Sequence, residues 1–216
     1  MIYTVTLNPA IDYVVNVDQF QVGEINRSKF DYKEAGGKGI NVSRVLNHFG
    51  TISTALGFVG GFTGEFITDY LTSLNISHDF VSLQQDTRIN VKMKSESEET
   101  ELNGVSPEIK ESDYKTFNSK IRNLTAGDIV VLAGSLPDSL PTDTYRDIVA
   151  TLRQQGVTAI LDSSGIPFSE AIKAKPAFVK PNNHELAELF NEKIETEQDI
   201  VTLANRFIKT LKLTMY

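Results

Sequence analysis

Four stretches of the chain carry apolar residues with the period of an α-helix. In each stretch the apolar positions fall at i, i+3, i+4 and i+7, which places them on one face of a helix. Gly50 and Gly156 follow two of the stretches, as is typical after a helix C-terminus. Thr196 and Asp199 resemble a capping box before the last one. The apolar sets are Val42, Val45, Leu46 and Phe49; Ile67, Tyr70, Leu71 and Leu74; Tyr145, Ile148, Val149 and Leu152; and Ile200, Leu203, Ala204, Phe207, Ile208 and Leu211.

Short apolar runs lie between these helical stretches and predict strands. Because strands and helices alternate along the chain, the pattern predicts an α/β fold with a mostly parallel sheet. In such sheets ligands bind beyond the carboxyl ends of the strands, so we expect the polar turns after the strands to share one rim. The runs are Ile2–Leu7, Thr54–Val59, Ile129–Ala133, Thr158–Leu161 and Ala177–Val179.

Two stretches depart from this alternation. Approximately residues 12–33 form two short polar strands around a turn. Residues 87–104 contain strict alternation, with Arg88, Asn90 and Lys92 on one face. Such alternation is typical of a half-exposed antiparallel strand. We therefore expect one domain over the 216 residues, with these two segments inserted as a small β-flap, or lid, over the rim.

Composition and charge narrow the possible functions. The chain is 40% hydrophobic and 23% charged, which is ordinary globular usage. It has no cysteine, which excludes disulfides and favours a reducing, cytoplasmic setting. We expect neither a signal peptide nor a membrane span, because no apolar run approaches about 20 residues. The net charge of −7 argues against a nucleic-acid partner but leaves room for a small anion.

The glycine-rich segment Gly36–Asn41 is the stretch most typical of ligand binding. It is not a Walker A loop, because Lys38 is followed by Gly39 instead of Ser or Thr. It is not a dinucleotide fingerprint either, because position 42 is valine. Glycines let a ligand approach the backbone, and a helix start attracts anions. A plain tight turn into a helix is the alternative interpretation.

Polar side chains gather at the predicted rim and lid. Asp12 follows the first strand, where a carboxylate can accept hydrogen bonds from sugar hydroxyls. Arg88, Asn90 and Lys92 share one strand face and can meet a phosphate together, since arginine suits bidentate phosphate contact. Asn103 belongs to the same surface. A solvated acid and a solvated strand face are the alternatives.

Further candidates follow the later strands. Ser135 places a hydroxyl at the rim, a good partner for phosphate oxygens. Lys180 ends the last apolar run, and Asn182 and Glu185 stand three apart across a predicted helix start, which suits a water-mediated Mg²⁺ site. An acid favoured by the helix dipole is the alternative for Glu185. Arg27, in the first lid segment, is a weaker candidate for contact with a phosphate.

Taken in order, these segments resemble the PfkB (ribokinase-like) carbohydrate kinases. They look most like the hexose-phosphate branch, the 1-phosphofructokinases and tagatose-6-phosphate kinases. The resemblance implies a ribokinase-like three-layer α/β/α fold with a lid, and ATP and Mg²⁺ as cofactors. The matching segments, which span nearly the whole chain, are Thr6–Asp12, Ala35–Val42, Thr87–Lys92, Gly134–Pro137 and Lys180–Asn182 with Glu185.

The resemblance also implies a role for each matched position. Arg88, Lys92 and Ser135 would lie near the substrate phosphate. Lys180, Asn182 and Glu185 would lie on the nucleotide and Mg²⁺ side, with Asn182 and Glu185 reaching the metal through water. The implied substrate-binding set is Asp12, Gly37, Lys38, Asn41, Arg88, Asn90, Lys92, Asn103 and Ser135.

The implied reaction is ATP-dependent phosphorylation of a ketohexose phosphate. Tyr13–Val15 and Glu101–Gly104 look more like the fructose branch, which converts fructose 1-phosphate to fructose 1,6-bisphosphate. Tagatose 6-phosphate is the alternative substrate. The implied partners are therefore the sugar phosphate and ATP, and pairing of two lids in a homodimer is compatible with such folds.

One part of the family pattern is absent. Members carry a Gly-Ala-Gly-Asp motif near the C-terminus, and its Asp is the general base, but no glycine follows Gly165 here. The glycine-rich ATP-binding strands expected after residues 196–211 are missing too, and the chain ends at Tyr216, where another strand is expected. Losing a general base costs about 10²–10⁴ in rate. We therefore expect a C-terminally truncated kinase with little or no activity, or a non-catalytic sugar-phosphate-binding fragment.

Overall fold

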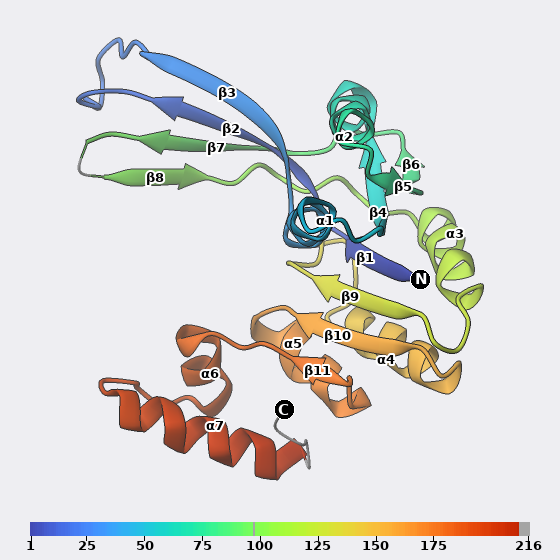
Figure 1. The fold of residues 1–216 in the computed structure, drawn as a ribbon. Helices are drawn as coiled ribbons and strands as arrows, with labels where there is room; N and C mark the ends of the chain where they lie inside the picture. The colour runs from blue at the N-terminus through green and yellow to red at the C-terminus, as the bar shows by residue number, and fades with distance from the viewer. Residues whose placement is uncertain (97, 212–216) are drawn as a thin grey trace.

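The apolar runs of the sequence form the strands of a central parallel sheet (Figure 1). The computed structural model describes residues 1–96 and 98–211. Within them the sheet has seven strands in the order β11-β10-β9-β1-β4-β5, with β6 beside β4, and each neighbouring pair is parallel. This confirms the predicted parallel sheet. The strands are β1 (Ile2–Thr6), β4 (Thr54–Gly60), β5 (Ser77–His78), β6 (Val81–Leu83), β9 (Ile129–Ala133), β10 (Thr158–Asp162) and β11 (Phe178–Val179).

Helices cover both faces of this sheet and make a three-layer α/β/α body. One buried cluster contains Ile40 and Leu71 from α1 and α2, and the other contains Phe117, Tyr145 and Phe168 from α3, α4 and α5. The predicted ribokinase-like layering is therefore confirmed. The helices are α1 (Lys38–His48), α2 (Gly61–Ser73), α3 (Glu111–Arg122), α4 (Thr144–Gln154), α5 (Gly165–Ala171), the 3₁₀ turn η1 (Ile172–Ala174), α6 (Asn183–Phe190) and α7 (Glu197–Leu211).

The two segments that break the alternation form a second sheet, which we call the lid. In the described residues it has four strands in the order β3-β2-β7-β8, and Figure 1 shows it extending away from the body. The expectation that residues 88–103 pair only antiparallel was wrong, because β7 runs parallel to β2. These two strands follow the body strands β1 and β6, so they leave the body at the same rim and run in the same direction. The lid strands are β2 (Ala10–Asn16), β3 (Phe30–Gly36), β7 (Ile89–Lys94) and β8 (Glu99–Leu102).

Helix α1 buries a different face from the one that its apolar residues predict. Val45 is 56% exposed and Phe49 is 76% exposed, whereas Gly39, Ile40 and Ser43 are buried. The small residues let α1 lie directly against β1. The hydroxyl of Ser43 is hydrogen-bonded there to a buried threonine hydroxyl at 2.7 Å. Close packing of the small face therefore overrides the apolar stripe.

The helix ends follow their sequence signals. Gly50 and Gly156 have φ of 71° and 73°, as expected after a helix C-terminus. Asp199 accepts a hydrogen bond from the Thr196 backbone N–H at 2.8 Å, and the Asp199 N–H donates to the Thr196 hydroxyl at 3.3 Å, which confirms the predicted capping box of α7. The strand expected to begin at residues 212–216 lies outside the described part of the chain. No helix in the described ranges has the length and apolar character needed to cross a membrane.

Candidate functional site

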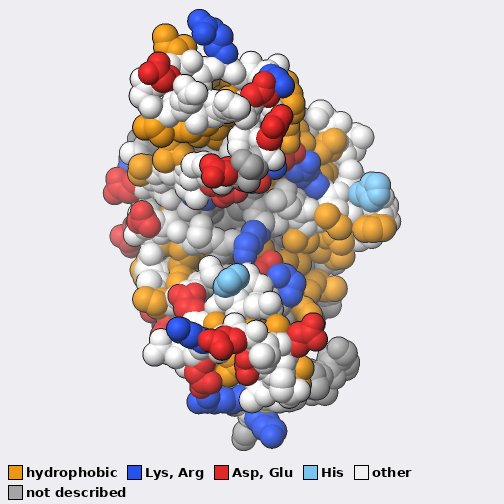
Figure 2. Space-filling view, turned by 90° about the vertical axis from the view of Figure 1, so that its left-hand side faces the viewer, with side chains coloured by type: hydrophobic (Ala, Val, Ile, Leu, Met, Phe, Trp, Pro, Cys, Tyr) orange, Lys and Arg blue, Asp and Glu red, His pale blue; other side chains and the backbone are white. Residues whose placement is uncertain are grey.

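A cavity of about 360 Å³ lies at the junction of the body and the lid. Figure 2 looks toward the side of the molecule that carries the lid above and the C-terminal helices below, and shows the surface hollowed between them. Each residue of the predicted substrate-binding set lines this cavity. The lining residues are Thr6, Asn8, Asp12, Gly37, Lys38, Asn41, Arg88, Asn90, Lys92, Glu101, Asn103, Gly134, Ser135 and Ser164.

The order of the strands explains why the cavity forms here. The chain continues from β1 to β4 on one side, and later returns to place β9 on the other side of β1. The loops after β1 and β9 therefore diverge and leave a crevice at their carboxyl ends, the usual ligand position in open α/β sheets. Asn8 follows β1, and Ser135 follows β9. Ser164 follows β10, next in the sheet.

The glycine segment brings the start of α1 against β1 at the cavity floor. Gly37 has φ of 125°, and a Cβ there would lie 2.6 Å from the Thr6 Cγ2 atom. A Cβ on Gly39 would lie 2.5 Å from the Thr6 hydroxyl oxygen, which accepts a hydrogen bond from the Ile40 N–H at 3.0 Å. The N-cap residue Gly37 has no side chain to cap the helix, so the amides that precede Ile40 favour an anionic or hydroxyl ligand.

Asp12 is the buried carboxylate of the lid side. It lies within β2, not in a loop, because the lid strand begins at Ala10. Its Oδ1 atom accepts a hydrogen bond from Asn90 Nδ2 at 3.1 Å, and its Oδ2 atom is 2.9 Å from Lys92 Nζ. The hydrogen bond to Asp12 raises the pKa of Lys92. The charges of Asp12 and Lys92 therefore compensate each other in the free cavity.

Arg88, unlike Lys92, contacts backbone carbonyl oxygens. Its Nη2 donates to the Asn8 carbonyl oxygen at 3.1 Å and its Nε to the Pro9 carbonyl oxygen at 3.4 Å. In the described part of the chain no carboxylate forms an ion pair with this guanidinium. Burial is the main influence on Arg88, and it lowers the pKa of the guanidinium. The structure thus holds a partly buried positive charge at the cavity that makes no ion pair in the described residues, although the charges of Asp12 and Asp138 partly offset the effect of burial on its pKa.

Lys38 crosses from the sugar side of the predicted site to the nucleotide side. Its Nζ lies 3.5 Å from both Asp162 Oδ1 and Glu185 Oε1, and Lys180 Nζ lies 3.6 Å from the same Asp162 oxygen. The sequence did not single out Asp162. Its signal was its place at the end of an apolar strand run, the same position that marks Lys180.

Asn182 and Glu185 form the capping box of α6. The Glu185 N–H donates to Asn182 Oδ1 at 2.8 Å, and the Asn182 N–H donates to Glu185 Oε2 at 2.9 Å. Glu185 is also buried. These bonds leave Glu185 Oε1 to face Lys38 Nζ, which is 3.5 Å away. In the described ranges no group of three or more His, Asp or Glu residues is arranged to hold a metal ion.

Arg27 is not brought to this site. It lines a separate hollow in the lid with Val17, Asp18 and Asn26. The loop between β2 and β3 carries it away from the rim, so it contributes no charge to the cavity in this chain.

The sequence and the fold both identify the family. The family model described as "pfkB family carbohydrate kinase" matches residues 5–215. The chain belongs to this family. Over 209 residues it is 49% identical to a 1-phosphofructokinase from Bacillus subtilis, a match that covers 97% of this chain and 69% of that protein. It is 38% identical to a tagatose-6-phosphate kinase from Staphylococcus epidermidis over 91% of this chain and 64% of the relative.

Solved structures of related kinases have a similar fold. Phosphofructokinase-2 from Escherichia coli, in complex with substrates and products, superposes with a TM-score of 0.92 at 29% identity, over 98% of this chain and 70% of the other. A ribokinase from Arabidopsis thaliana superposes with a TM-score of 0.72 at 22% identity, over 96% of this chain and 68% of the other, and shows the shared fold.

Several residues that line the cavity were not predicted as site residues. Thr6 and Asn8 lie in the first matching motif, and Gly134 lies beside Ser135. Asn8 buries a side-chain Oδ1 atom without a hydrogen-bond partner in the described structure, while its Nδ2 donates to the Ser135 hydroxyl at 3.4 Å. Ser164 had no sequence signal beyond its place after β10.

Proposed function

We propose that the cavity binds a ketohexose phosphate and that fructose 1-phosphate is its ligand. The proposal rests mainly on the position of Arg88. Its guanidinium forms no ion pair with a carboxylate in the described residues, and it lines the same cavity as Ser135. A phosphate monoester supplies the missing anion, and charge-assisted bonds to arginine are among the strong ones. The named activities of the relatives support a sugar phosphate as the ligand.

The rest of the cavity suits the sugar. Asp12 accepts hydrogen bonds from hydroxyl groups, and Asn90 and Lys92 hold its carboxylate in place. The amides at Gly37 and the side chain of Asn41 close the floor. This set fixes hydroxyl groups at one end of the ligand while Arg88 and Ser135 fix the phosphate.

We propose that ATP binds on the side of Lys180, Asn182 and Glu185. Phosphoryl transfer depends mostly on positioning and charge stabilisation. Mg²⁺, when bound with ATP, neutralises charge that develops on the transferred group. In this chain Lys38 bridges the two halves of the site, and Glu185 Oε1 is the oxygen that can contact the hydrated ion.

Two alternatives follow from specific observations. Tagatose 6-phosphate is the second candidate ligand, because a tagatose-6-phosphate kinase is 38% identical to this chain. A protein that binds the sugar phosphate without phosphorylating it is the candidate of another class. Asp12, a buried acid of the cavity, is committed to Asn90 and Lys92, which disfavours it as a general base.

Calorimetric titration and a coupled kinase assay test these proposals on the 216-residue polypeptide. We expect fructose 1-phosphate to bind more tightly than tagatose 6-phosphate, and ATP turnover to be absent or slow. Tighter binding of tagatose 6-phosphate would reverse the assignment of the sugar. Turnover at the 1–100 s⁻¹ typical of kinases would overturn the non-catalytic alternative. Absence of heat with both sugars would refute sugar-phosphate binding.

We also propose that two lids pair in a homodimer. The lid exposes apolar side chains on its strands, with Phe30 57%, Tyr32 47% and Leu102 69% exposed. Phe30 and Tyr32 alternate along β3 and so share one face. Exposed apolar patches of this kind are typical of protein–protein contacts.

A further inference from the structure

We propose that Arg44 is a positioning residue for the sugar-binding amide of Asn41, an inference that rests on the proposed function. Arg44 lies on α1, three residues after Asn41, so the two side chains are neighbours on the helix. Arg44 Nη1 donates to Asn41 Oδ1 at 3.2 Å, and Arg44 Nη2 donates to Glu34 Oε2 at 2.9 Å. Glu34 belongs to lid strand β3, so one guanidinium joins the body helix, the lid and a cavity side chain.

Asn41 and Arg44 differ in the hollows that they line. Asn41 lines both the sugar cavity and a groove on the outer face of α1, whereas Arg44 lines only the groove. Arg44 therefore orients Asn41 without touching the ligand. Because Asn41 Oδ1 is engaged by Arg44, the amide nitrogen is the group left for the cavity. Asn41 then acts as a hydrogen-bond donor to an acceptor oxygen of the ligand, a ring, hydroxyl or phosphate oxygen.

Arg44 is itself held from three directions. Its guanidinium lies 5.6 Å from the centre of the Tyr70 ring, which fits a cation–π contact. Its side chain is 31% exposed and that of Glu34 is 30% exposed. In the lid sheet Glu34 stands opposite Asp12. The Arg44–Glu34 pair thus fixes the lid strand next to the buried carboxylate while the second arm of the fork fixes Asn41.

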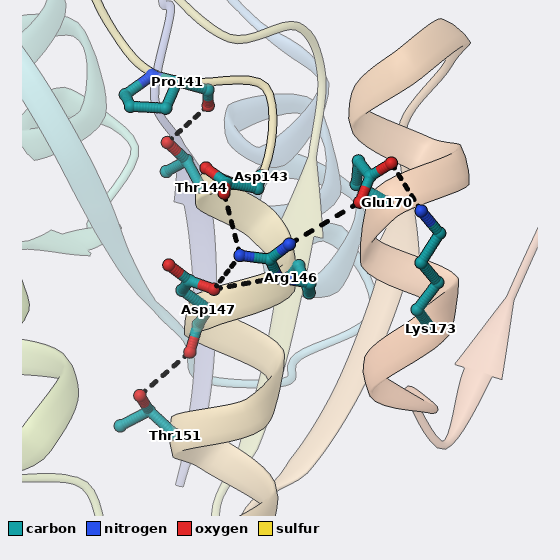
Figure 3. A network of polar contacts seen from close by, with 8 residues as sticks. All are labelled: Pro141, Asp143, Thr144, Arg146, Asp147, Thr151, Glu170 and Lys173. Carbon is teal, nitrogen blue, oxygen red and sulfur yellow. Dashed lines mark hydrogen bonds and ion pairs between the residues drawn. The ribbon is translucent and has the colours of Figure 1, made fainter.

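The chain offers a matched control in Arg146. Figure 3 shows Arg146 on α4 between Asp143, Asp147 and Glu170, linking α4 to α5. Its side chain is 37% exposed, close to that of Arg44, but it does not line the sugar cavity. Arg146→Gln therefore removes a comparable ionic network without reaching the ligand site.

A double-mutant cycle tests the inference with fructose 1-phosphate as the probe. We expect Arg44→Gln to weaken binding about fivefold to tenfold, the effect of one misplaced hydrogen bond. In the Asn41→Ala background the same substitution should cost no further affinity. Arg146→Gln should leave the affinity unchanged. Equal losses from Arg44→Gln with and without Asn41, or no loss in either, would overturn the inference.

Two further measurements keep the test decisive. Arg44→Lys retains a cation opposite Glu34 but not the fork that reaches both partners, so it should fold and still lose affinity. NMR relaxation of the Asn41 side-chain ¹⁵N signal should report a rigid amide in the ligand-free wild type and in Arg146→Gln, but a mobile amide in Arg44→Gln. An Asn41 signal unchanged by Arg44→Gln would contradict positioning. A wild type that binds no sugar phosphate would instead refute the proposed function, with the Asn41 signal still deciding the role of Arg44.

Discussion

At the scale of single residues, the positive charges of the cavity differ in their partners. Lys92 is paired with Asp12, and Lys38 lies between Asp162 and Glu185. Arg88 alone among the predicted phosphate ligands is held by backbone carbonyls in the described structure. Neutral partners anchor its position without neutralising its charge. Among these three cations, Arg88 is therefore the best prepared to bind an anion, because it makes no ion pair in the described residues.

The pH dependence of sugar-phosphate affinity follows from these charges. Asp12 raises the pKa of Lys92, so its positive charge is fully present below that pKa, and the Arg88 guanidinium stays protonated although burial lowers its pKa. No histidine of the described chain lines the cavity. Between pH 5 and 8 the ligand is then the group that titrates, since a phosphate monoester has a second pKa of about 6.

Affinity for fructose 1-phosphate should therefore fall by about tenfold from pH 7.5 to pH 5, as the dianion is lost. Calorimetric titration across this range measures it, with thermal melts to confirm that the chain stays folded at each pH. An affinity that is flat or rises toward pH 5 would contradict the assignment of the phosphate to Arg88.

At the scale of elements, the capping box of α6 sets the position of Glu185. Asn182→Ala should destabilise the chain by about 1 kcal/mol, because it removes the acceptor for the Glu185 N–H. Asn182→Asp keeps an acceptor and should be close to wild type. Urea denaturation measures both. Equal losses for the two substitutions would show that the cap does not depend on this acceptor.

The strands and helices differ in how far the sequence predicts them. The parallel strands were predictable because each is a short apolar run between helical stretches. The buried face of α1 was not, because periodicity records where Val45 and Phe49 lie but not that Gly39 and Ser43 allow closer packing on β1. The direction of β7 relative to β2 depends on where each strand leaves the body, which alternation along one strand does not record.

The site was predictable for a related reason. Ser135 and Lys180 follow strands of the parallel sheet, whose carboxyl ends meet at one rim, so their convergence needed no coordinates. Asp12, Asn90 and Lys92 instead lie within lid strands, and they are brought together by the pairing of β2 with β7. Asp162 and Arg44 were missed because their roles arise only from contacts with Lys38 and Asn41. Asn182 and Glu185 were expected to face one point, and the structure shows that they also bond to each other across the helix start.

At the scale of the whole molecule, the body and the lid are two sheets joined around one cavity. Figure 1 shows the lid strands continuing from the rim of the body sheet. The body supplies Lys38, Asn41 and Ser135, and the lid supplies Asp12 and Lys92. Neither sheet alone holds the predicted substrate-binding set, so any event that moves the lid changes the cavity.

Pairing of two lids should be sensitive to charge on their exposed apolar face. Phe30→Lys and Tyr32→Lys, on one face of β3, each remove apolar burial worth about 1.5–3 kcal/mol and should shift the dimer toward monomer by about ten- to a hundredfold. Light scattering over a dilution series measures the shift. Phe49→Lys, at the exposed apolar residue that follows α1, is the control. A monomeric wild type, or a dimer that Phe49→Lys disrupts instead, would contradict pairing through the lid.

We propose that Arg88 holds the phosphate of a sugar phosphate in this cavity. Parallel calorimetric titrations of the wild type, Arg88→Gln and Arg146→Gln with fructose 1-phosphate and with fructose test this claim. We predict that the wild type and Arg146→Gln bind the phosphorylated sugar alike and prefer it to fructose. Arg88→Gln should lose about ten- to a hundredfold in affinity, as for a lost hydrogen bond to a charged group. Equal affinity for the two sugars, or an Arg88→Gln variant that binds as the wild type does, would contradict the claim.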